Sequence, residues 1–580
     1  MGVVPATVLA YFFACKFEFN PEFQLLPPNF PKNLTLELSN FVNWADEIVV
    51  EDIWTAYPES AAQVLMLTNW AVDHNYTIRA SGAMHNWSPL TVDILKTFAS
   101  DKGIFKYLFP GSNLRNNVGK TILVKTMNYL NNMEIISAGD QNASFWAQPG
   151  ILLVDLLKTL ERHKLGILNY PAIGEITLGG ALAIGAHGTG APAKYETLSK
   201  GHTYGSLSNL VIAFTTIVYD KDSNKYVLKE FHRSEATSGA FLVHLGKTFV
   251  TNVTMRAGPL QYVRCQSFTD ISAQELFDEN NGLRSIPNFL NRSGRIEVIW
   301  FPFTSNPWLK VWTVSETKPE ASLYVHEAYN YPFTDRFPEA LALILGKITS
   351  WWDNVKIINR LYMKFITFGL TVTGTWDIWG ASPNVFFYVK PETLKMTESG
   401  WAIVTSRSDV RKALQIFYEL YTSILDKYSR KNRYPMNGPL GVRITGVDNP
   451  QDVGIDQAQT CGICSSRPVL NKPELDTVIW LNILTFRTSY EFTMFVEEIQ
   501  NSLNENFDGA WAVVRVEWSK GFAYSSLHSS AWTNQTHLKD IIPGSWTDWE
   551  SSKDTLNQFD PFQVFSNQLL NTLFQARKDL

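Results

Sequence analysis

The segment Pro171–Gly190 contains the densest run of glycines in the chain, at positions 174, 179, 180, 185, 188 and 190. Residues without a Cβ let several backbone N–H groups turn toward one anion, as a pyrophosphate requires. The run lacks the GxGxxG spacing and the downstream acidic partner that define a Rossmann site. The segment therefore predicts either a phosphate cradle of another fold class or a purely structural loop.

Length and composition bound the number and class of domains. A chain of 580 residues exceeds what one core usually holds, and 45% apolar residues suffice for two cores. The net charge is −5, with Lys and Arg dispersed, whereas nucleic-acid binding needs a concentrated basic face. We therefore exclude nucleic acid as a partner. The 19 Trp, 22 Tyr and 36 Phe residues indicate large cores and also suit ring-containing ligands.

The N-terminal residues 1–26 are predicted to be a leader. Their apolar run, Met1–Cys15, is too short to span a bilayer and no stop-transfer pattern follows it. No later run reaches about 18 apolar residues. Glycosylation sequons, which suit a secreted glycoprotein, begin at Asn33, Asn75, Asn86, Asn142, Asn252, Asn291 and Asn534. We expect a soluble, secreted protein.

The chain has four cysteines, too few for a disulfide-built scaffold of this size. Cys461 and Cys464 have the spacing of a redox motif, but Ser-Ser-Arg-Pro follows where a thioredoxin-like helix would start. We expect a small-loop disulfide or two idle thiols. No second CxxC or paired-histidine spacing accompanies them, so no metal site is predicted.

The first half of the chain alternates helical and strand-like patterns, which indicates a mixed α and β domain. The predicted helices are Glu59–Val72 and Ile151–His163, and the predicted strands are Tyr76–Arg79, Thr121–Val124, Glu134–Ser137, Phe249–Met255 and a hairpin of Val211–Tyr219 with Lys225–Phe231.

From about Gln261 the pattern predicts an antiparallel sheet with helices on one side, and the fold class is α+β. The predicted strands are Ile296–Phe301, Trp308–Val314, Val385–Val389, Trp401–Thr405, Val442–Thr445 and Val478–Leu484. The predicted helices, Pro338–Ser350, Trp352–Phe368 and Val410–Lys427, either cover the sheet or form a lid over a pocket. Trp351 and Trp352 either pack normally or touch a membrane, the latter only if the substrate is a sterol.

The loop around His85, in the sequence Arg-Ala-Ser-Gly-Ala-Met-His-Asn-Trp-Ser-Pro-Leu (79–90), resembles the covalent flavin attachment loop of vanillyl-alcohol oxidase-type flavoproteins. The resemblance is closest to the bacterial cholesterol oxidases with covalently bound FAD. Blocks that resemble the same family follow in the same order at 201–210, 300–303, 307–314 and 377–380. The resemblance runs almost continuously from about residue 28 to the end.

This resemblance implies a two-domain FAD-binding fold with FAD bonded to His85. It places a leader at 1–26, an FAD-binding domain at 27–258, a substrate-binding domain at 259–545 and a return to the FAD-binding domain at 546–580. The implied cofactor-binding residues are His85, Arg79, Ser81, Gly82, Ala83, Met84, Gly174, Gly179, Gly180, Gly185, His187, Gly188, Tyr204, Gly205, Ser208, Asn209, Val253 and Asn567.

The family also implies catalytic groups on the substrate side, and motif matching places them at Arg443, Glu297, Glu398 and Asn482. The family has a glutamate two residues before its arginine, where this chain has Gly441. Alternation along a strand puts both positions on one face, so the change alters the pocket itself. Without that carboxylate, we expect Arg443 to stabilise negative charge on the reduced cofactor or to gate access by switching partners.

The resemblance implies a secreted oxidase that passes electrons from a secondary alcohol to molecular oxygen, giving a ketone, or an acyl cyanide, and hydrogen peroxide. The substrate is an aromatic alcohol or cyanohydrin such as mandelonitrile, or a sterol such as cholesterol. One alternative is a flavin-binding protein that has lost catalysis and binds an apolar ligand. Another is an FAD dehydrogenase that uses a different acceptor.

Overall fold

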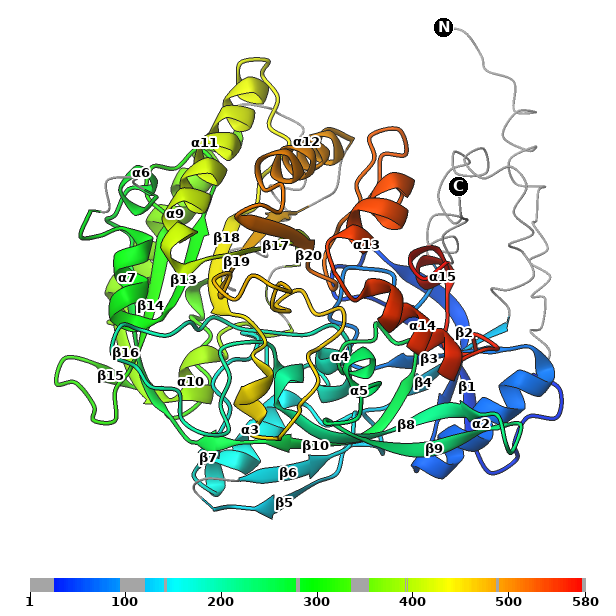
Figure 1. The fold of residues 1–580 in the computed structure, drawn as a ribbon. Coiled ribbons are helices and arrows are strands. Elements are labelled where there is room, and N and C mark those ends of the chain that lie inside the picture. The colour runs from blue at the N-terminus through cyan, green and yellow to red at the C-terminus, as the bar shows by residue number, and fades with distance from the viewer. Residues whose placement is uncertain are drawn as a thin grey trace, which may run out of the picture.

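The computed structural model describes residues 26–93, 120–139, 143–277, 282–334, 354–391, 393, 395–486 and 490–575. In Figure 1 the blue to teal chain builds one part of the molecule, and the green to orange chain builds a second part above it. The first part contains a four-stranded sheet and a five-stranded sheet, and the second contains a nine-stranded sheet.

The four-stranded sheet has the order β1-β2-β4-β3, and the helix α2 packs against it. The elements are β1 (Thr35–Val42), β2 (Val49–Tyr57), α2 (Ala61–His74), β3 (Thr77–Ser81) and β4 (Thr121–Lys125). Helix α2 begins where the Ser60 side chain accepts a hydrogen bond from the Gln63 N–H, and it ends at Asn75 in the left-handed region. The predicted helix and strand are confirmed here, with α2 shifted by two residues.

The five-stranded sheet has the order β5-β6-β10-β8-β9 and is antiparallel throughout. Its strands are β5 (Met133–Ser137), β6 (Ser144–Ala147), β8 (Val211–Asp220), β9 (Lys225–His232) and β10 (Phe249–Arg256), and β7 (Leu165–Gly166) pairs with β11 (Gly258–Pro259) beside it. Strands β8 and β9 pair as the predicted hairpin. The short helices of this part are α3 (Leu153–Arg162), α4 (Leu178–Ala183), η5 (Leu207–Leu210) and α5 (Ser238–Leu242).

The nine-stranded sheet of the second part has the order β15-β16-β12-β14-β13-β18-β19-β17-β20, and only the β15–β16 pair is parallel. Its strands are β12 (Tyr262–Phe268), β13 (Arg295–Trp300), β14 (Trp308–Val314), β15 (Leu323–Tyr324), β16 (Asp377–Ala381), β17 (Thr397–Thr405), β18 (Leu440–Gly446), β19 (Thr477–Thr485) and β20 (Ala512–Val516). The prediction of a largely antiparallel sheet is confirmed.

Strand alternation gives this sheet two different faces. Val298, Val442 and Leu481 belong to an apolar core with residues of α7 (Ile286–Ser293), α11 (Val410–Ser429) and α12 (Tyr490–Asn506). The residues next to them, including Glu297 and Arg443, point to the opposite face because successive side chains alternate. The covering helices therefore fix which side of the sheet carries the polar residues.

Two helices lie on the polar face, so the prediction that the helices lie on one side of the sheet is wrong. They are α9 (Asn354–Thr373) and α10 (Ser382–Phe386), whose buried residues share a core with Trp308 and Trp312. The predicted strand Val385–Val389 is wrong, because α10 occupies its first two positions. Pro383 stands in the first turn of this helix, where its fixed φ favours helix initiation.

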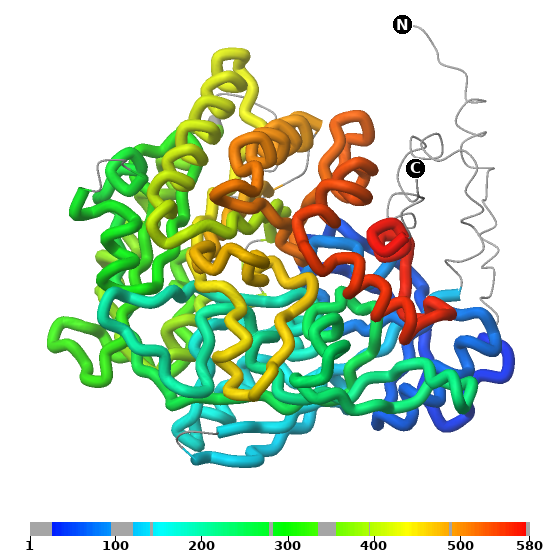
Figure 2. The backbone as a smooth tube through the Cα atoms, in the orientation of Figure 1, coloured from blue at the N-terminus to red at the C-terminus, as the bar shows by residue number. Residues whose placement is uncertain are grey.

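The C-terminal segment returns to the first part of the molecule. Asn567 donates a hydrogen bond to the Pro89 carbonyl, and the Gln568 N–H donates to Asp93. The red tube in Figure 2 lies beside the blue and teal tubes accordingly. This segment holds α14 (Trp549–Phe559) and α15 (Gln568–Leu573), preceded by η8 (His537–Ile541) and α13 (Ile542–Gly544); the remaining short helices are α6 (Ala273–Leu276), η6 (Arg407–Asp409) and η7 (Pro450–Val453). The domain limits at 258 and 545 stay predictions.

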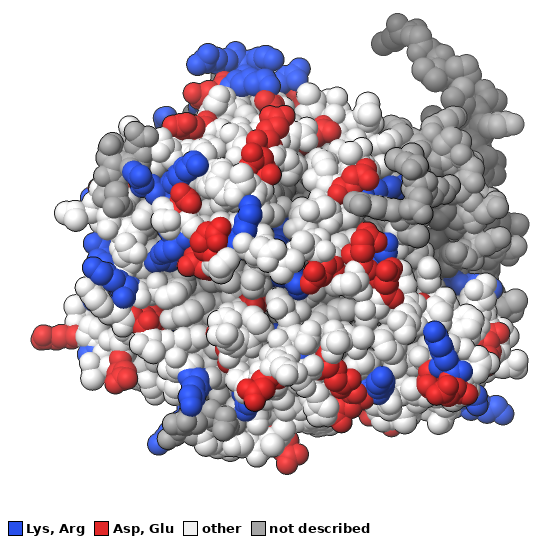
Figure 3. Space-filling view, in the orientation of Figure 1, with Lys and Arg blue, Asp and Glu red and all other residues white. Residues whose placement is uncertain are grey.

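Several predictions fall outside the described residues: most of the leader, the sequon at Asn142, the helix Pro338–Ser350 and the tryptophan pair 351–352. Among the helices that the structure does describe, none combines the length and apolarity needed to cross a membrane. Figure 3 shows acidic and basic side chains interspersed over most of the face in view.

Candidate active site

Three cavities meet at His85. The first, of about 280 Å³, contains His85 together with Arg443, Glu297, Glu398 and other residues of the nine-stranded sheet. The second, of about 150 Å³, and the third, of about 450 Å³, both contain Gly82, Ala83, Met84 and His85. The His85 loop is thus the shared wall between the substrate-side sheet and the first part of the molecule.

The His85 imidazole is held in an aromatic setting. Its ring centroid lies 4.8 Å from the ring of Trp44 and 5.4 Å from that of Trp87. Burial, with the nearby positive charge of Lys520, lowers the pKa of His85 to about 3, so the imidazole is neutral near pH 7. The following loop is fixed because the N–H groups of Trp87 and Ser88 both donate to the Ser519 carbonyl.

The second cavity brings the His85 loop against the glycine run. Gly179 and Gly180 line it together with Gly82, and a Cβ at Gly82 would lie 2.2 Å from Thr177 Oγ1. Gly82 therefore permits a close approach that no other residue allows. Arg79 also lines this cavity, and its guanidinium donates to four backbone carbonyls that include those of Leu245 and Phe565.

The structure brings together about half of the cofactor-binding residues predicted from the sequence. Those that line the three cavities are Arg79, Gly82, Ala83, Met84, His85, Gly179, Gly180, Gly185 and His187. Those that do not line them are Ser81, Gly174, Gly188, Tyr204, Gly205, Ser208, Asn209, Val253 and Asn567.

The residues away from the cavities are engaged by other parts of the protein. A Cβ at Gly205 would lie 2.2 Å from an oxygen of Asp448, and the Ser208 hydroxyl donates to the Leu182 carbonyl. Asn209 accepts a hydrogen bond from Arg233. These contacts pack the 204–209 turn against the protein interior. A direct contact of these residues with the cofactor stays a prediction.

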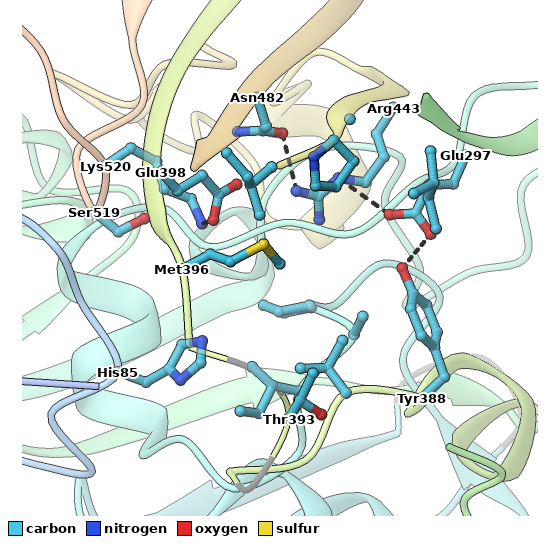
Figure 4. Close-up of a pocket in the computed structure, with 18 of the residues that line it drawn as sticks. His85, Glu297, Tyr388, Thr393, Met396, Glu398, Arg443, Asn482, Ser519 and Lys520 are labelled. Carbon is cyan, nitrogen blue, oxygen red and sulfur yellow. Dashed lines mark hydrogen bonds and ion pairs between the residues drawn. The ribbon is translucent and has the colours of Figure 1, made fainter. Parts of the chain in front are cut away.

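All four predicted catalytic residues line the first cavity. Glu297 on β13 pairs in register with Arg443 on β18, and Gly441 on β18 pairs with Asn482 on β19. Arg443 donates to the Asn482 side-chain oxygen at 3.0 Å, and its Nε lies 3.9 Å from a Glu297 oxygen. Figure 4 shows Arg443 between these two partners.

The neighbouring carboxylates and one lysine make a second polar group. Lys520 lies 2.5 Å from Glu398 and 3.9 Å from Glu517, and Glu517 accepts a hydrogen bond from Asn482 at 2.6 Å. Burial raises the pKa of Glu398. Burial would also raise that of Glu517, but Lys520, His187 and Arg443 together lower it to about 2.

Glu517 and Lys520 were missed by the sequence reasoning. Both lie beyond the end of the buried strand β20, separated by more than 70 residues from β18. Charged residues are rarely buried unless they are paired. A carboxylate and an ammonium three residues apart, directly after a strand of apolar residues, could therefore have indicated Glu517 and Lys520. His187 joins the same group, because its ring stacks on Trp480 at 3.4 Å and its Nε2 lies 3.7 Å from Glu517.

The rest of the first cavity is apolar, with Tyr362 and Ile366 of α9 forming one side. Of the two alternatives predicted for this helical segment, covering the sheet or forming a lid over a pocket, the structure thus places α9 at the pocket. Other apolar members are Ile173, Ile299, Phe301, Trp308, Tyr331, Val389 and Leu484. Such a lining accepts a largely apolar ligand, and the few polar groups can orient a polar part of it.

Gly441 leaves room in the cavity where the related motif carries a glutamate. An ideal Cβ at this position would meet Asn482 at 3.5 Å, which is an ordinary van der Waals contact. The backbone therefore does not require glycine here. With glycine at position 441, Glu297 is the one ion-pair partner of Arg443 among the described residues.

Cys461 and Cys464 are buried free thiols beside Asp448. The Asp448 carboxylate already accepts hydrogen bonds from Ser206 and Ser466. Burial lowers the pKa of the neighbouring Arg233 guanidinium, while the nearby acidic groups, among them Cys461 and Asp448, raise it. The free thiols agree with the second of the two predicted alternatives, two idle thiols instead of a small-loop disulfide. That no metal binds here stays a prediction.

Comparison with known proteins agrees with this geometry. A family model described as the substrate-binding domain of cholesterol oxidase matches residues 262–575. A solvent-stable cholesterol oxidase structure is 38% identical with a TM-score of 0.88, covering 95% of this chain and 100% of that chain. The cholesterol oxidase of Brevibacterium sterolicum is 35% identical with a TM-score of 0.87, covering 95% and 99%.

A curated relative is the L-gulonolactone oxidase of Bos taurus, 25% identical over 174 residues, which is 30% of this chain and 34% of the relative. The chain thus spans about a third of that protein. The fold is that of a flavoprotein of the vanillyl-alcohol oxidase type. Within that class, the chain belongs to the cholesterol oxidase family.

The cavities fit FAD, the cofactor of this family. The glycine-lined cavity and the cavity beside Lys125 share Gly82, Ala83 and Met84 as lining residues, and both share His85 with the substrate-side cavity. Three neighbouring cavities along one loop suit an elongated dinucleotide. The neutral His85 nitrogen is the group available to hold the flavin ring.

Proposed function

We propose that this protein is a secreted FAD-dependent oxidase of secondary alcohols. The reaction would convert the alcohol and O₂ to a ketone, or to an acyl cyanide from a cyanohydrin, and hydrogen peroxide. The observation that carries the proposal is that Arg443, Glu297, Glu398 and Asn482 line one cavity, which His85 also lines. FAD, when bound, would accept the hydride from the carbinol carbon.

The chain's own residues would supply three functions. Arg443 is half-buried, and the neighbouring carboxylates raise its pKa although burial opposes this, so it keeps a positive charge facing the cavity. Glu297 or Glu398 would take the hydroxyl proton, and burial suits Glu398 to hold a proton nearer to neutrality. His85 would bond the cofactor and thereby fix the ring relative to these groups.

Two substrate classes fit the apolar cavity. An aromatic alcohol or cyanohydrin such as mandelonitrile is favoured by the cavity volume of about 280 Å³, at the low end for sites that enclose drug-sized ligands. The open space at Gly441 also distinguishes the site from the related motif. A sterol is the second candidate, favoured by the similarity to cholesterol oxidases.

Secretion is part of the proposal and is supported by sequons at the exposed residues Asn33, Asn75 and Asn291. Expression in a eukaryotic secretory host should yield protein in the medium whose mobility increases after deglycosylation. Retention in the cell without a mobility change would contradict this part.

The direct test is a peroxide assay of the holoenzyme with sterols, benzylic alcohols and cyanohydrins. Peroxide from one class assigns the substrate. Turnover only with an artificial electron acceptor would indicate a dehydrogenase. Bound FAD without turnover of any donor would indicate a binding protein, although the retention of four polar groups in one cavity argues against that alternative.

A further inference from the structure

Lys310 is a buried lysine that the proposed chemistry does not use. Lys310 lies on β14 and is fully buried. Its Nζ atom has no hydrogen-bond partner among the described residues. Burying an unpaired ammonium costs several kcal/mol, so an apolar residue would stabilise this position better. The presence of lysine here therefore needs a reason other than packing.

The surroundings of Lys310 are aromatic. Its Nζ lies 3.1 Å from the ring centroid of Tyr388, 4.3 Å from that of Tyr331, 5.0 Å from that of Trp308 and 5.3 Å from that of Trp312. Ring faces attract a cation but accept no proton from it. Three of these rings, Trp308, Tyr331 and Tyr388, also line the substrate-side cavity. Lys310 thus lies directly behind the cavity wall.

The sheet register connects Lys310 to the candidate catalytic residues. Lys310 on β14 is paired with Glu297 on β13, and Glu297 is paired with Arg443 on β18. One carboxylate therefore stands between two cations in a row across three strands. The Tyr388 hydroxyl donates a hydrogen bond to Glu297 (Figure 4). The ring of the same tyrosine covers the Lys310 ammonium.

We propose that Lys310 is a positioning residue that divides the Glu297 carboxylate between two cations and so leaves the Arg443 charge available to the alcohol. The inference rests on the proposed oxidase function. When Lys310 is charged, it attracts Glu297 and holds the Tyr388 ring. When Lys310 is neutral, Glu297 interacts with Arg443 alone and offsets more of the positive charge that faces the cavity.

Among the titratable groups of this cluster, Lys310 is the one whose pKa lies near 8. Burial lowers its pKa to about 8. Of the other titratable groups that face it, burial raises the pKa of Cys265 on β12 to about 11 and those of Tyr331 and Tyr388 well above 10. Glu297 faces it from β13, with Arg443 behind on β18. Because burial also raises the pKa of Glu398 in the same cavity, a transition near pH 8 is assigned to Lys310 only by its loss in a Lys310 variant.

The test compares Lys310→Met, Lys310→Arg and the wild-type holoenzyme, with Lys553→Met as the control. Lys553 is also a buried lysine, but it lies on α14 and pairs with Glu550. We expect wild-type kcat to fall as pH rises through about 8. Lys310→Met should show kcat about tenfold lower below pH 8, little change in KM and no transition, whereas Lys310→Arg and Lys553→Met should keep the low-pH rate.

A second readout is independent of turnover: the visible spectrum of the resting flavin, titrated over the same pH range. We expect a transition near pH 8 in the wild type and in Lys553→Met, and none in Lys310→Met. If no alcohol is oxidised but this spectral transition depends on Lys310, the oxidase proposal fails and the electrostatic link stands. A transition that persists in Lys310→Met, or a wild type without one, would overturn the inference.

Discussion

Glu297 and Arg443 face each other in register across β13 and β18, with Glu297 Oε1 3.9 Å from Arg443 Nε, at the wall of the cavity that ends at His85. The arginine is held on its other side by Asn482. This arrangement fixes the guanidinium while leaving it one carboxylate partner among the described residues.

Replacing Arg443 with methionine should therefore remove transition-state stabilisation and leave the cofactor site intact. We expect kcat to fall by about 10²–10³-fold, as for the loss of one preorganised electrostatic group. FAD content should be unchanged. The check is steady-state peroxide formation beside the flavin-to-protein absorbance ratio. The matched control is Arg264→Met, which breaks the ion pair with Asp377 on β16 away from the cavity. Equal losses in both variants would contradict a specific role for Arg443.

Gly441→Glu should place a carboxylate next to Arg443 on the same strand face. The backbone has room for a side chain, because the ideal Cβ makes only an ordinary contact with Asn482. We expect kcat to fall about tenfold, or about 1.4 kcal/mol, since part of the arginine charge is neutralised. Gly441→Gln adds the same bulk without charge and should retain more of the rate. If the two variants lose the same fraction of kcat, then Gly441 matters for the space that it leaves and not for the absence of a charge.

The Lys520–Glu398 pair should matter for stability. Lys520→Met leaves Glu398 buried near Glu517 without its partner, so we expect the unfolding free energy to fall by about 3–5 kcal/mol at pH 7. Adding Glu398→Gln to that variant removes the orphaned charge and should recover much of the loss. Urea unfolding of the three proteins measures both effects. No recovery in the double variant would show that packing, and not charge, is responsible.

Lys310→Met should stabilise the protein below about pH 8. The folded-state pKa of about 8 lies below the ordinary value of 10.5, so the unfolded chain binds the proton more tightly. Wild-type stability therefore rises between about pH 8 and 10.5, and the advantage of the variant, at most about 3 kcal/mol at pH 7, should disappear over that range. A difference in unfolding free energy that does not vary with pH would contradict a charged lysine at this site.

The sequence was sufficient where a residue's role follows from a local pattern. The patterns around Glu297 and Arg443 predicted strands, and strand alternation placed positions 441 and 443 on one face. The loop around His85 carried a long and specific motif. It was insufficient where position depends on how distant segments meet. Lys520 reaches Glu398 only because the segment after β20 folds back over β17, which no local pattern encodes.

At Val385–Val389 the local pattern predicted a strand where the structure has the end of a helix. The apolar and aromatic residues of this segment suit a strand, but Pro383 initiates a helix and tertiary packing against Trp312 stabilises it. The turn at 204–209 was assigned to the cofactor from family resemblance, and that assignment stays a prediction. Its packing against Asp448 and Arg233 could not be predicted from the sequence, because it depends on long-range contacts.

His85→Ala tests the attachment of the cofactor. We expect the wild-type protein to keep its yellow colour in the pellet after acid precipitation, and the variant to release FAD into the supernatant. Acid unfolds the protein and disrupts the three cavities. Flavin that is not covalently bonded to the chain is therefore released. Flavin released from the wild type would contradict the predicted bond.

The most direct test of the central claim is anaerobic mixing of the holoenzyme with an aromatic alcohol, a cyanohydrin or a sterol while the flavin absorbance is followed. We predict that one of these classes bleaches the flavin, that readmitted oxygen restores its colour with release of hydrogen peroxide, and that Arg443→Met slows the bleaching. A flavin that stays oxidised with every donor, or one that is bleached equally fast in Arg443→Met, would contradict the account.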